Sequence, residues 1–312
     1  MKNVVTVVVT YNGMPWIDRC LASLTASTHP TTILVIDNGS ADGTPAFIRQ
    51  HYPDLQMIIS EGNLGFGQAN NIGLQIAIQE GAGHVFLLNQ DAWVEPETIG
   101  SLVNTQQENP QFGILSPLHY DGRGEGLDEY FLTYLLQSSI RDWVGDLVRG
   151  LPGQRIIGTG FVNAAAWLIS ADCLRSTGLF DPVFFHYGED ENYAQRVLFH
   201  GSQIGIHTGS RIGHDREDRL LKEKATAPEP WSPRAAKKEW MQVLIRATDI
   251  RRPGYKAFLL RRMARHALSG LTAFLTLDWR RARYHGFILK NIVSHWTRIG
   301  ESRSRSLATR PT

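Results

Sequence analysis

The stretch His84-Val85-Phe86-Leu87-Leu88-Asn89-Gln90-Asp91 is a short apolar run that ends in polar residues. Earlier runs rich in β-branched residues, at 4–10, 32–37 and 56–60, have the same character. Between the four runs, apolar residues recur at helical spacing in three segments, 15–26, 44–51 and 68–80. Strands that alternate with helices predict βαβ units. We therefore predict an α/β fold in which a mostly parallel, Rossmann-like sheet is flanked by helices.

Polar residues stand where each predicted strand ends. In an open parallel sheet, ligands bind outside the carboxyl ends of the strands, so these residues are candidates for the chemistry. They are Thr10-Tyr11-Asn12, Asp37-Asn38-Gly39-Ser40, Glu61-Gly62-Asn63 and Asn89-Gln90-Asp91. We expect the functional site at this edge.

Two of these segments allow more than one interpretation. Asp37 with its following turn either forms a turn and a helix cap or offers a carboxylate to a nucleobase or ribose. The run 63–71, NLGFGQANN, departs from the dinucleotide pattern G-x-G-x-x-G because Asn70 occupies the place of the third glycine. Asn70 and Asn71 either present amides to a nucleotide or cap the following helix.

Three acidic residues and one histidine are candidates for catalysis. Asp91 follows the most apolar strand and is either a ligand of a hard metal ion or a solvated loop acid. Glu189 and Asp190 follow an aromatic run at a predicted helix start, where acids either favour the helix dipole or serve as a general base. His214, after a short apolar run, is either a surface residue or a ligand.

The order and spacing of these segments resemble glycosyltransferase family 2, and especially its rhamnosyltransferase-like branch, which builds bacterial surface polysaccharides. The resemblance covers residues 4 to about 214. The matching segments are Val8-Val9-Thr10-Tyr11-Asn12, Asp37 to Thr44, Asn63 to Gly67 with Asn70-Asn71-Ile72-Gly73, Leu87 to Asp91, and Phe180-Asp181 through Glu189-Asp190.

The resemblance implies a GT-A fold and a role for each matching residue. It implies that the donor nucleotide contacts Thr10, Tyr11, Asn12, Asp37, Asn63, Phe66, Asn71 and Gln90. It implies that Asp91 and His214 bind Mn²⁺ or Mg²⁺ at the diphosphate. It makes Asp190 the catalytic base of an inverting transfer, with Glu189 as the nearby competitor.

Two departures from the family pattern stand out. The metal motif is usually D-x-D, whereas Asn89-Gln90-Asp91 keeps only the last carboxylate, so we expect a modest metal affinity. Residues 163–167, Asn-Ala-Ala-Ala-Trp, replace a more glycine-rich segment, which leaves acceptor recognition open.

The two parts of the chain differ sharply in charge. Residues 215–312 hold 22 basic and 9 acidic residues, a net charge of +13, whereas residues 1–214 carry −11. We predict a catalytic domain at 1–215 and a basic, mainly helical extension at 216–312, with a proline-rich linker at 226–233. Such asymmetry is typical of a tail that meets phosphate.

The segment 253–277 mixes four cations with leucine and phenylalanine, which suits a helix lying in a membrane interface. The alternative is a helix packed on the catalytic domain or on a second subunit of a homo-oligomer. The absence of a signal sequence and the presence of only two cysteines, Cys20 and Cys173, lead us to expect a cytoplasmic protein, peripheral on the inner face of the membrane.

The expected reaction is transfer of L-rhamnose from TDP-rhamnose to a polysaccharide or polyprenyl-linked glycan acceptor. Both sugar and acceptor rest on the resemblance. A nucleotidyltransferase would need a basic, glycine-rich loop after the first strand, and Thr10-Tyr11-Asn12-Gly13 lacks it. A non-catalytic binder of sugar nucleotides would not need Asp91, Asp190 and His214, and we expect no nucleic-acid partner.

Overall fold

The computed structural model describes residues 3–151, 153, 155–216 and 229–308. These residues form two compact units. We call the described residues up to Arg216 the α/β unit and those from Glu229 to Ala308 the helical unit. Part of the predicted linker, residues 226–228, lies outside the described residues.

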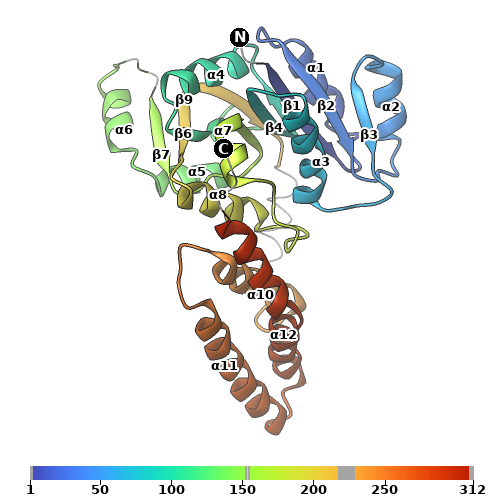
Figure 1. Cartoon of the computed structure of the whole chain (residues 1–312), viewed down its shortest axis with the longest axis vertical. Helices are drawn as coiled ribbons and strands as arrows, with labels where there is room; N and C mark the ends of the chain where they lie inside the picture. The colour runs from blue at the N-terminus through green and yellow to red at the C-terminus, as the bar shows by residue number, and fades with distance from the viewer. Residues whose placement is uncertain (1–2, 152, 154, 217–228, 309–312) are drawn as a thin grey trace. The chain divides into compact units, whose positions relative to one another are not determined.

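A mixed sheet of nine strands forms the centre of the α/β unit (Figure 1). Its parallel half has the order β3-β2-β1-β4. These strands are β1 (Val4–Thr10), β2 (Thr31–Asp37), β3 (Gln56–Ile59) and β4 (His84–Asn89). In register, Thr10 lies opposite Asp37, and Val9 lies opposite Asn89. The polar residues after these strands are thereby brought to one edge.

The other half of the sheet contains antiparallel strands. Its strands are β5 (Ala92–Val94), β6 (Phe112–Asp121), β7 (Ile156–Thr159), β8 (Ala166–Ser170) and β9 (Gln203–His214). The fully buried β8 lies between β4 and β6 and is antiparallel to both. β9 runs parallel to β6, and its end pairs antiparallel with β5.

Helices cover both faces of the sheet because the strand residues alternate in direction. Val5 and Val7 point to one face, which is covered by α3, α5, α7 and α8. Val4 and Val8 point to the other, covered by α1, α2 and α4. The helices of this unit are α1 (Ile17–Thr25), α2 (Thr44–His51), α3 (Phe66–Gln79), α4 (Thr98–Glu108), α5 (Glu129–Leu136), α6 (Arg141–Val148), α7 (Ala171–Thr177) and α8 (Glu189–Phe199). The predicted α/β fold with a mostly parallel, helix-flanked sheet is confirmed.

The helical unit consists of α10 (Pro233–Thr248), α11 (Tyr255–Leu275) and α12 (Trp279–Leu307). Ser232 caps α10 by accepting a hydrogen bond from the Ala235 N–H, and Pro233 fits the first helical turn. Leu259, Ile288 and Ile292 are buried among the three helices. In the part of the chain that the structure describes, no helix is both long and apolar enough to span a bilayer.

Candidate active site

Gln90 joins the ends of β1 and β4. Its Oε1 accepts hydrogen bonds from the Thr10 hydroxyl at 2.7 Å and from the Tyr11 N–H at 2.8 Å. Its Nε2 donates to the Tyr11 carbonyl at 3.2 Å. Three predicted donor-binding residues are thus adjacent, and the polar atoms of Gln90 fix the turn after β1.

Asn12 and Asp37 lie side by side in the loops after β1 and β2. Asn12 has a left-handed backbone (φ +50°), accepts the Ala41 N–H through Oδ1, and donates its own N–H to the Ser40 hydroxyl. Asp37 is fully buried, and its Oδ1 accepts the Ser40 N–H at 3.0 Å. Its Oδ2 is buried and has no hydrogen-bond partner in the described part of the chain. An unpaired buried carboxylate oxygen is costly, so Asp37 would gain a partner if the loops after β1 and β2 admitted a ligand N–H or hydroxyl, such as that of a base or a ribose.

The glycine turn before α3 is built for close approach. Asn63 Oδ1 accepts from the Asn38 amide at 3.1 Å and from the Gly65 N–H at 2.9 Å. A Cβ on Gly65, which has φ +81°, would lie 1.8 Å from the Phe185 carbonyl oxygen. The turn therefore packs directly on the segment that precedes α8, which only glycine permits.

Phe66 and Asn71 of α3 hold that segment in place. The Phe66 ring meets the Phe180 ring edge-on, with centroids 6.0 Å apart. The Asn71 amide donates to the Phe180 carbonyl at 2.9 Å, and its Oδ1 accepts the Phe180 N–H at 2.8 Å. Both polar atoms of Asn71 bind the Phe180 backbone, so this side chain positions the segment leading to α8, and its contact with the donor stays a prediction.

Asp91 and His214 meet because β5 pairs with β9. Ala92 lies opposite His214, and the Asp215 N–H donates to the Asp91 carbonyl at 2.8 Å. His214 Nε2 lies 3.3 Å from Asp91 Oδ1, at ion-pair distance. Both nitrogens of the buried His214 ring lack a well-aligned hydrogen-bond partner among the described residues.

The charges around Asp91 keep it ionised. Burial alone would raise the pKa of its carboxyl, but His214 and then Arg216 outweigh burial and hold the pKa below the usual range. A carboxylate and an imidazole whose nitrogens have no well-aligned hydrogen bond fit a divalent ion such as Mn²⁺ or Mg²⁺. Within the described residues, no cluster of three or more His, Cys, Asp or Glu could hold a metal alone. Two protein ligands therefore leave most coordination positions for other groups.

Glu189 and Asp190 open α8 directly after Gly188 and Tyr187, both in the left-handed region with φ of +85° and +69°. Asp190 Oδ1 accepts the Glu191 N–H at 2.8 Å. Burial raises the pKa of Asp190 in spite of backbone hydrogen bonds from Glu191 and Ala164. Asp190 also lies close enough to the Tyr134 hydroxyl to contribute, after burial, to raising the Tyr134 pKa to about 12.

Glu189 is the more deeply buried acid of the pair, only 5% exposed. Burial, and then the charge of Asp190, raise its pKa, and its Oε2 has no hydrogen-bond partner within the described segments. Gly67, in the first turn of α3, lies against its side chain. Asp190 is partly exposed and therefore accessible to a substrate, whereas Glu189 is enclosed.

Sequence reasoning missed five residues around Asp91 and His214. Arg216 forms a fork with Asp128, at 2.5 and 3.1 Å, and lowers the pKa of Asp91. The Trp16 indole donates to Asp215 at 3.1 Å. His119 is fully buried with its ring 5.9 Å from that of His214, and burial holds its pKa well below the usual value. Arg216 follows His214 by two residues, which was the one available signal.

Relatives of the chain are found by sequence. The model of "Glycosyl transferase family 2" matches residues 6–151. N-acetylglucosaminyl-diphospho-decaprenol L-rhamnosyltransferase of Mycobacterium tuberculosis is 30% identical over 223 residues, which span 63% of this chain and 71% of that protein. The chain belongs to glycosyltransferase family 2. The dTDP-rhamnosyl transferase RfbF of Shigella flexneri is 20% identical over 71% of this chain and 72% of its own length.

Solved structures of other glycosyltransferases share the fold of this family member. TarS of S. aureus, residues 1–349 in complex with UDP-GlcNAc, has a TM-score of 0.54 at 17% identity, covering 80% of this chain and 66% of that one. The mannosyltransferase PcManGT of Pyrobaculum calidifontis, in complex with GDP-Man and Mn²⁺, has a TM-score of 0.54 at 16% identity, covering 95% and 87%. The GT-A-type fold is therefore shown. As a member of glycosyltransferase family 2, the protein is a glycosyltransferase that uses a nucleotide-sugar donor.

Proposed function

We propose that this glycosyltransferase transfers L-rhamnose from TDP-rhamnose, with inversion, to a polysaccharide or lipid-linked glycan acceptor. The proposed reaction is supported mainly by the contact between Asp91 and His214. This contact lies at the edge of the sheet where Thr10, Asp37 and Gln90 also lie. The choice of rhamnose is supported by the M. tuberculosis and S. flexneri relatives, whose names give that sugar. Family membership sets aside the nucleotidyltransferase and the non-catalytic alternatives.

In the proposed reaction, Asp190 accepts the proton of an acceptor hydroxyl. The hydroxyl oxygen forms a bond to the anomeric carbon while the bond from that carbon to the diphosphate oxygen breaks, and the nucleoside diphosphate leaves. Attack opposite the leaving group inverts the configuration. A divalent ion bound to Asp91 and His214 would supply positive charge beside the departing diphosphate.

The donor side of the proposal is built from the loops after β1 and β2. In this proposal Asp37 pairs its unpartnered Oδ2 with the nucleoside once the loops admit it, and the 44% exposed ring of Tyr11 contributes an aromatic surface. Asn63 shapes the glycine turn before α3 through its hydrogen bonds to Asn38 and Gly65. Gln90 and Asn71 act by positioning the turn after β1 and the segment before α8.

The donor is tested by thermal unfolding with Mn²⁺ and a panel of TDP-rhamnose, UDP-GlcNAc and GDP-mannose. A ligand that binds the folded state raises the unfolding temperature. We expect TDP-rhamnose to give the largest rise and to be the donor used in transfer. A larger effect of UDP-GlcNAc or GDP-mannose, matched by turnover, would replace rhamnose and leave the reaction type in place.

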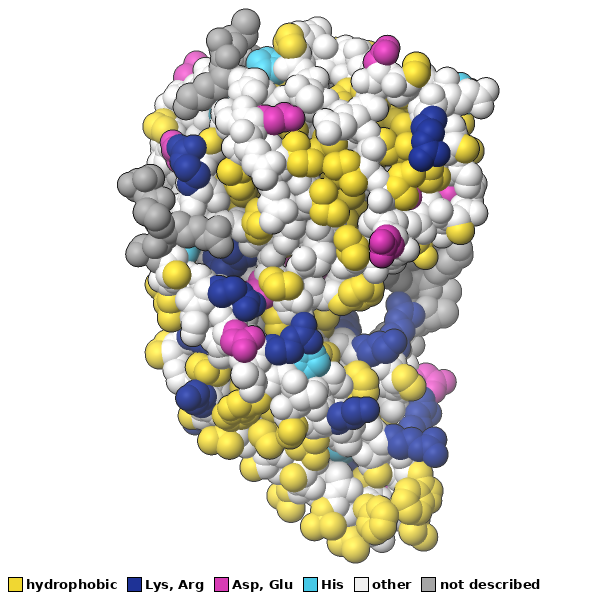
Figure 2. All heavy atoms as spheres, turned by 45° about the vertical axis from the view of Figure 1, so that its right-hand side comes forward, with side chains coloured by type: hydrophobic (Ala, Val, Ile, Leu, Met, Phe, Trp, Pro, Cys, Tyr) yellow, Lys and Arg dark blue, Asp and Glu magenta, His cyan; other side chains and the backbone are white. Residues whose placement is uncertain are grey.

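We further propose that the helical unit attaches the enzyme to the cytoplasmic face of an anionic membrane. Large apolar side chains gather at the end of this unit where α11 gives way to α12 (Figure 2). Each is more than half exposed: Leu268, Leu271, Phe274, Leu275, Leu277 and Trp279. Exposed apolar side chains on a basic helical element are typical of interfacial binding.

A further inference from the structure

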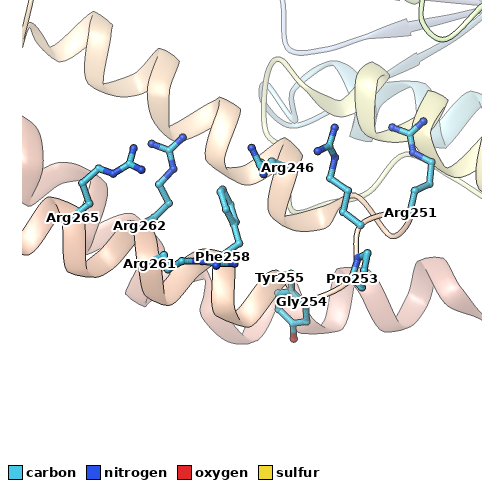
Figure 3. Close-up of a pocket in the computed structure, with 10 residues that line it drawn as sticks. Arg246, Arg251, Pro253, Gly254, Tyr255, Phe258, Arg261, Arg262 and Arg265 are labelled. Carbon is cyan, nitrogen blue, oxygen red and sulfur yellow. The ribbon is translucent and has the colours of Figure 1, made fainter.

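A basic pocket of about 480 Å³ lies within the helical unit, away from the catalytic residues in the sequence. The end of α10, the following loop and the first half of α11 line it (Figure 3). Six of its ten lining residues are arginines: Arg246, Arg251, Arg252, Arg261, Arg262 and Arg265. We call it the arginine pocket.

Acidic side chains neutralise only part of this charge. Arg251 and Arg252 share Asp249, and Arg262 pairs with Glu239 at 3.1 Å. Arg246, Arg261 and Arg265 form no ion pair with any described residue. Guanidinium groups stay charged at all ordinary pH values, so their clustering around one cavity is unfavourable unless an anion fills it.

The arginine side chains and the loop are held in position before any ligand arrives. The guanidinium carbons of Arg246 and Arg262 lie 4.7 and 5.7 Å from the centroid of the Phe258 ring, a cation–π arrangement visible in Figure 3. Arg303 of α12 donates to the carbonyls of Ala247 and Asp249 at 3.1 and 2.5 Å. The loop between α10 and α11 is thereby fixed, and the carbonyl oxygens at the end of α10 are neutralised.

The start of α11 also favours an anion. Gly254 precedes this 21-residue helix in the left-handed region (φ +72°), and no side chain caps the first turn. Gly254 and Tyr255 line the pocket, so the free N–H groups and positive dipole end of α11 lie beside the arginines.

We infer that the arginine pocket binds a phosphoryl oxyanion, a phosphate or diphosphate group that is either free or carried by a lipid. Arginine forks match the paired oxygens of phosphate, and the volume exceeds the need of one phosphate alone. The exposed Leu260 and Leu268 on the same helix favour a lipid as the carrier. Only this choice of carrier rests on the proposed membrane attachment.

The test measures binding of inorganic pyrophosphate to the full-length protein by calorimetry, in EDTA so that no metal assists the donor site. The double variant Arg246→Gln/Arg265→Gln removes two unpaired pocket cations. Arg283→Gln/Lys290→Gln removes equal charge from exposed positions of α12 outside the pocket. We expect the pocket variant to bind at least ~10-fold more weakly and the α12 variant to bind as the wild type does. Equal weakening in both variants, or no binding by the wild type, would overturn the inference.

A second arm separates the two carriers. The same proteins are sedimented with vesicles of phosphatidylcholine, with and without phosphatidylglycerol. Loss of sedimentation in the pocket variant alone supports a lipid phosphate as the ligand. Pyrophosphate binding without sedimentation supports a soluble phosphoryl ligand and contradicts the membrane proposal only. Donor hydrolysis by the pocket variant should match the wild type, so failure of the proposed reaction would be seen separately.

Discussion

The α/β part and the helical part of the chain have net charges of opposite sign, yet we propose that each binds phosphate. Residues 1–214 carry a net charge of −11, and the candidate ligand residues there are a carboxylate and a histidine. Residues 215–312 carry +13, and the arginine pocket presents six guanidinium groups. An acidic unit needs a cation to hold a diphosphate, whereas a basic unit holds one directly. Chelators and salt should therefore act on different units.

The largest effect is expected from Asp190→Asn. The amide keeps the shape of the side chain but cannot accept the acceptor proton, so transfer should fall by roughly 10² to 10⁴. Steady-state transfer measures the loss, and thermal shift with the donor checks that binding persists. Glu189→Gln is the matched control. A dead Glu189→Gln and an active Asp190→Asn would reverse the two roles.

The pH dependence of transfer follows from the raised pKa of Asp190. The base must be deprotonated, and burial favours its neutral form, so kcat/KM should rise with pH through a midpoint above the usual aspartate range. Rates across pH 4 to 9 locate the midpoint. A profile that is flat from pH 4 upward would contradict Asp190, with its raised pKa, as the base.

High salt should weaken vesicle binding by the helical unit only in part. Each cation near an anionic surface contributes about 1 kcal/mol, which salt screens, whereas apolar insertion is not screened. Sedimentation should weaken at high ionic strength without vanishing, and Leu271→Ser/Leu275→Ser should remove the salt-resistant remainder. Truncation before residue 229 should abolish sedimentation. A full-length protein indifferent to anionic vesicles at low salt would instead favour a packing or oligomerisation role.

The smallest effect concerns stability. Because the pKa of Glu189 is raised in the folded protein, its contribution to stability is present at low pH and is lost as pH rises above the usual glutamate range. The Glu189→Gln variant cannot ionise at this position. Its free energy of unfolding, relative to that of the wild type, should therefore increase by on the order of 1 kcal/mol from pH 5 to pH 8. Urea unfolding at both values measures this. An unchanged difference would show that Glu189 ionises freely.

The parallel half of the sheet could be predicted from the sequence because its signals are local. β1 and β4 begin and end where their apolar runs do, and α2 was predicted at its observed bounds. The antiparallel half could not be predicted in this way. β8 pairs with β4 across about eighty residues, and no periodicity specifies such a partner.

In the site, too, local features could be predicted from the sequence and long-range contacts could not. The polar ends of β1, β2 and β4 follow from strand order, but the approach of His214 to Asp91 depends on the pairing of β5 with β9. The residues alone leave His214 as either a surface residue or a ligand, and the family resemblance favours the ligand. The engagement of Asn71 with the Phe180 backbone is a tertiary contact that the sequence alone does not reveal.

The most direct test of the account is a Mn²⁺ titration of sugar transfer after treatment with EDTA, for the wild type and Asp91→Ala. The wild type should lose activity in EDTA and regain it as Mn²⁺ is added, because Asp91 and His214 supply the only protein ligands we assign. Asp91→Ala should remain nearly inactive at every Mn²⁺ concentration while its thermal unfolding shows an intact fold. Full transfer by the wild type in EDTA, or by Asp91→Ala, would contradict the assignment of the metal to this pair.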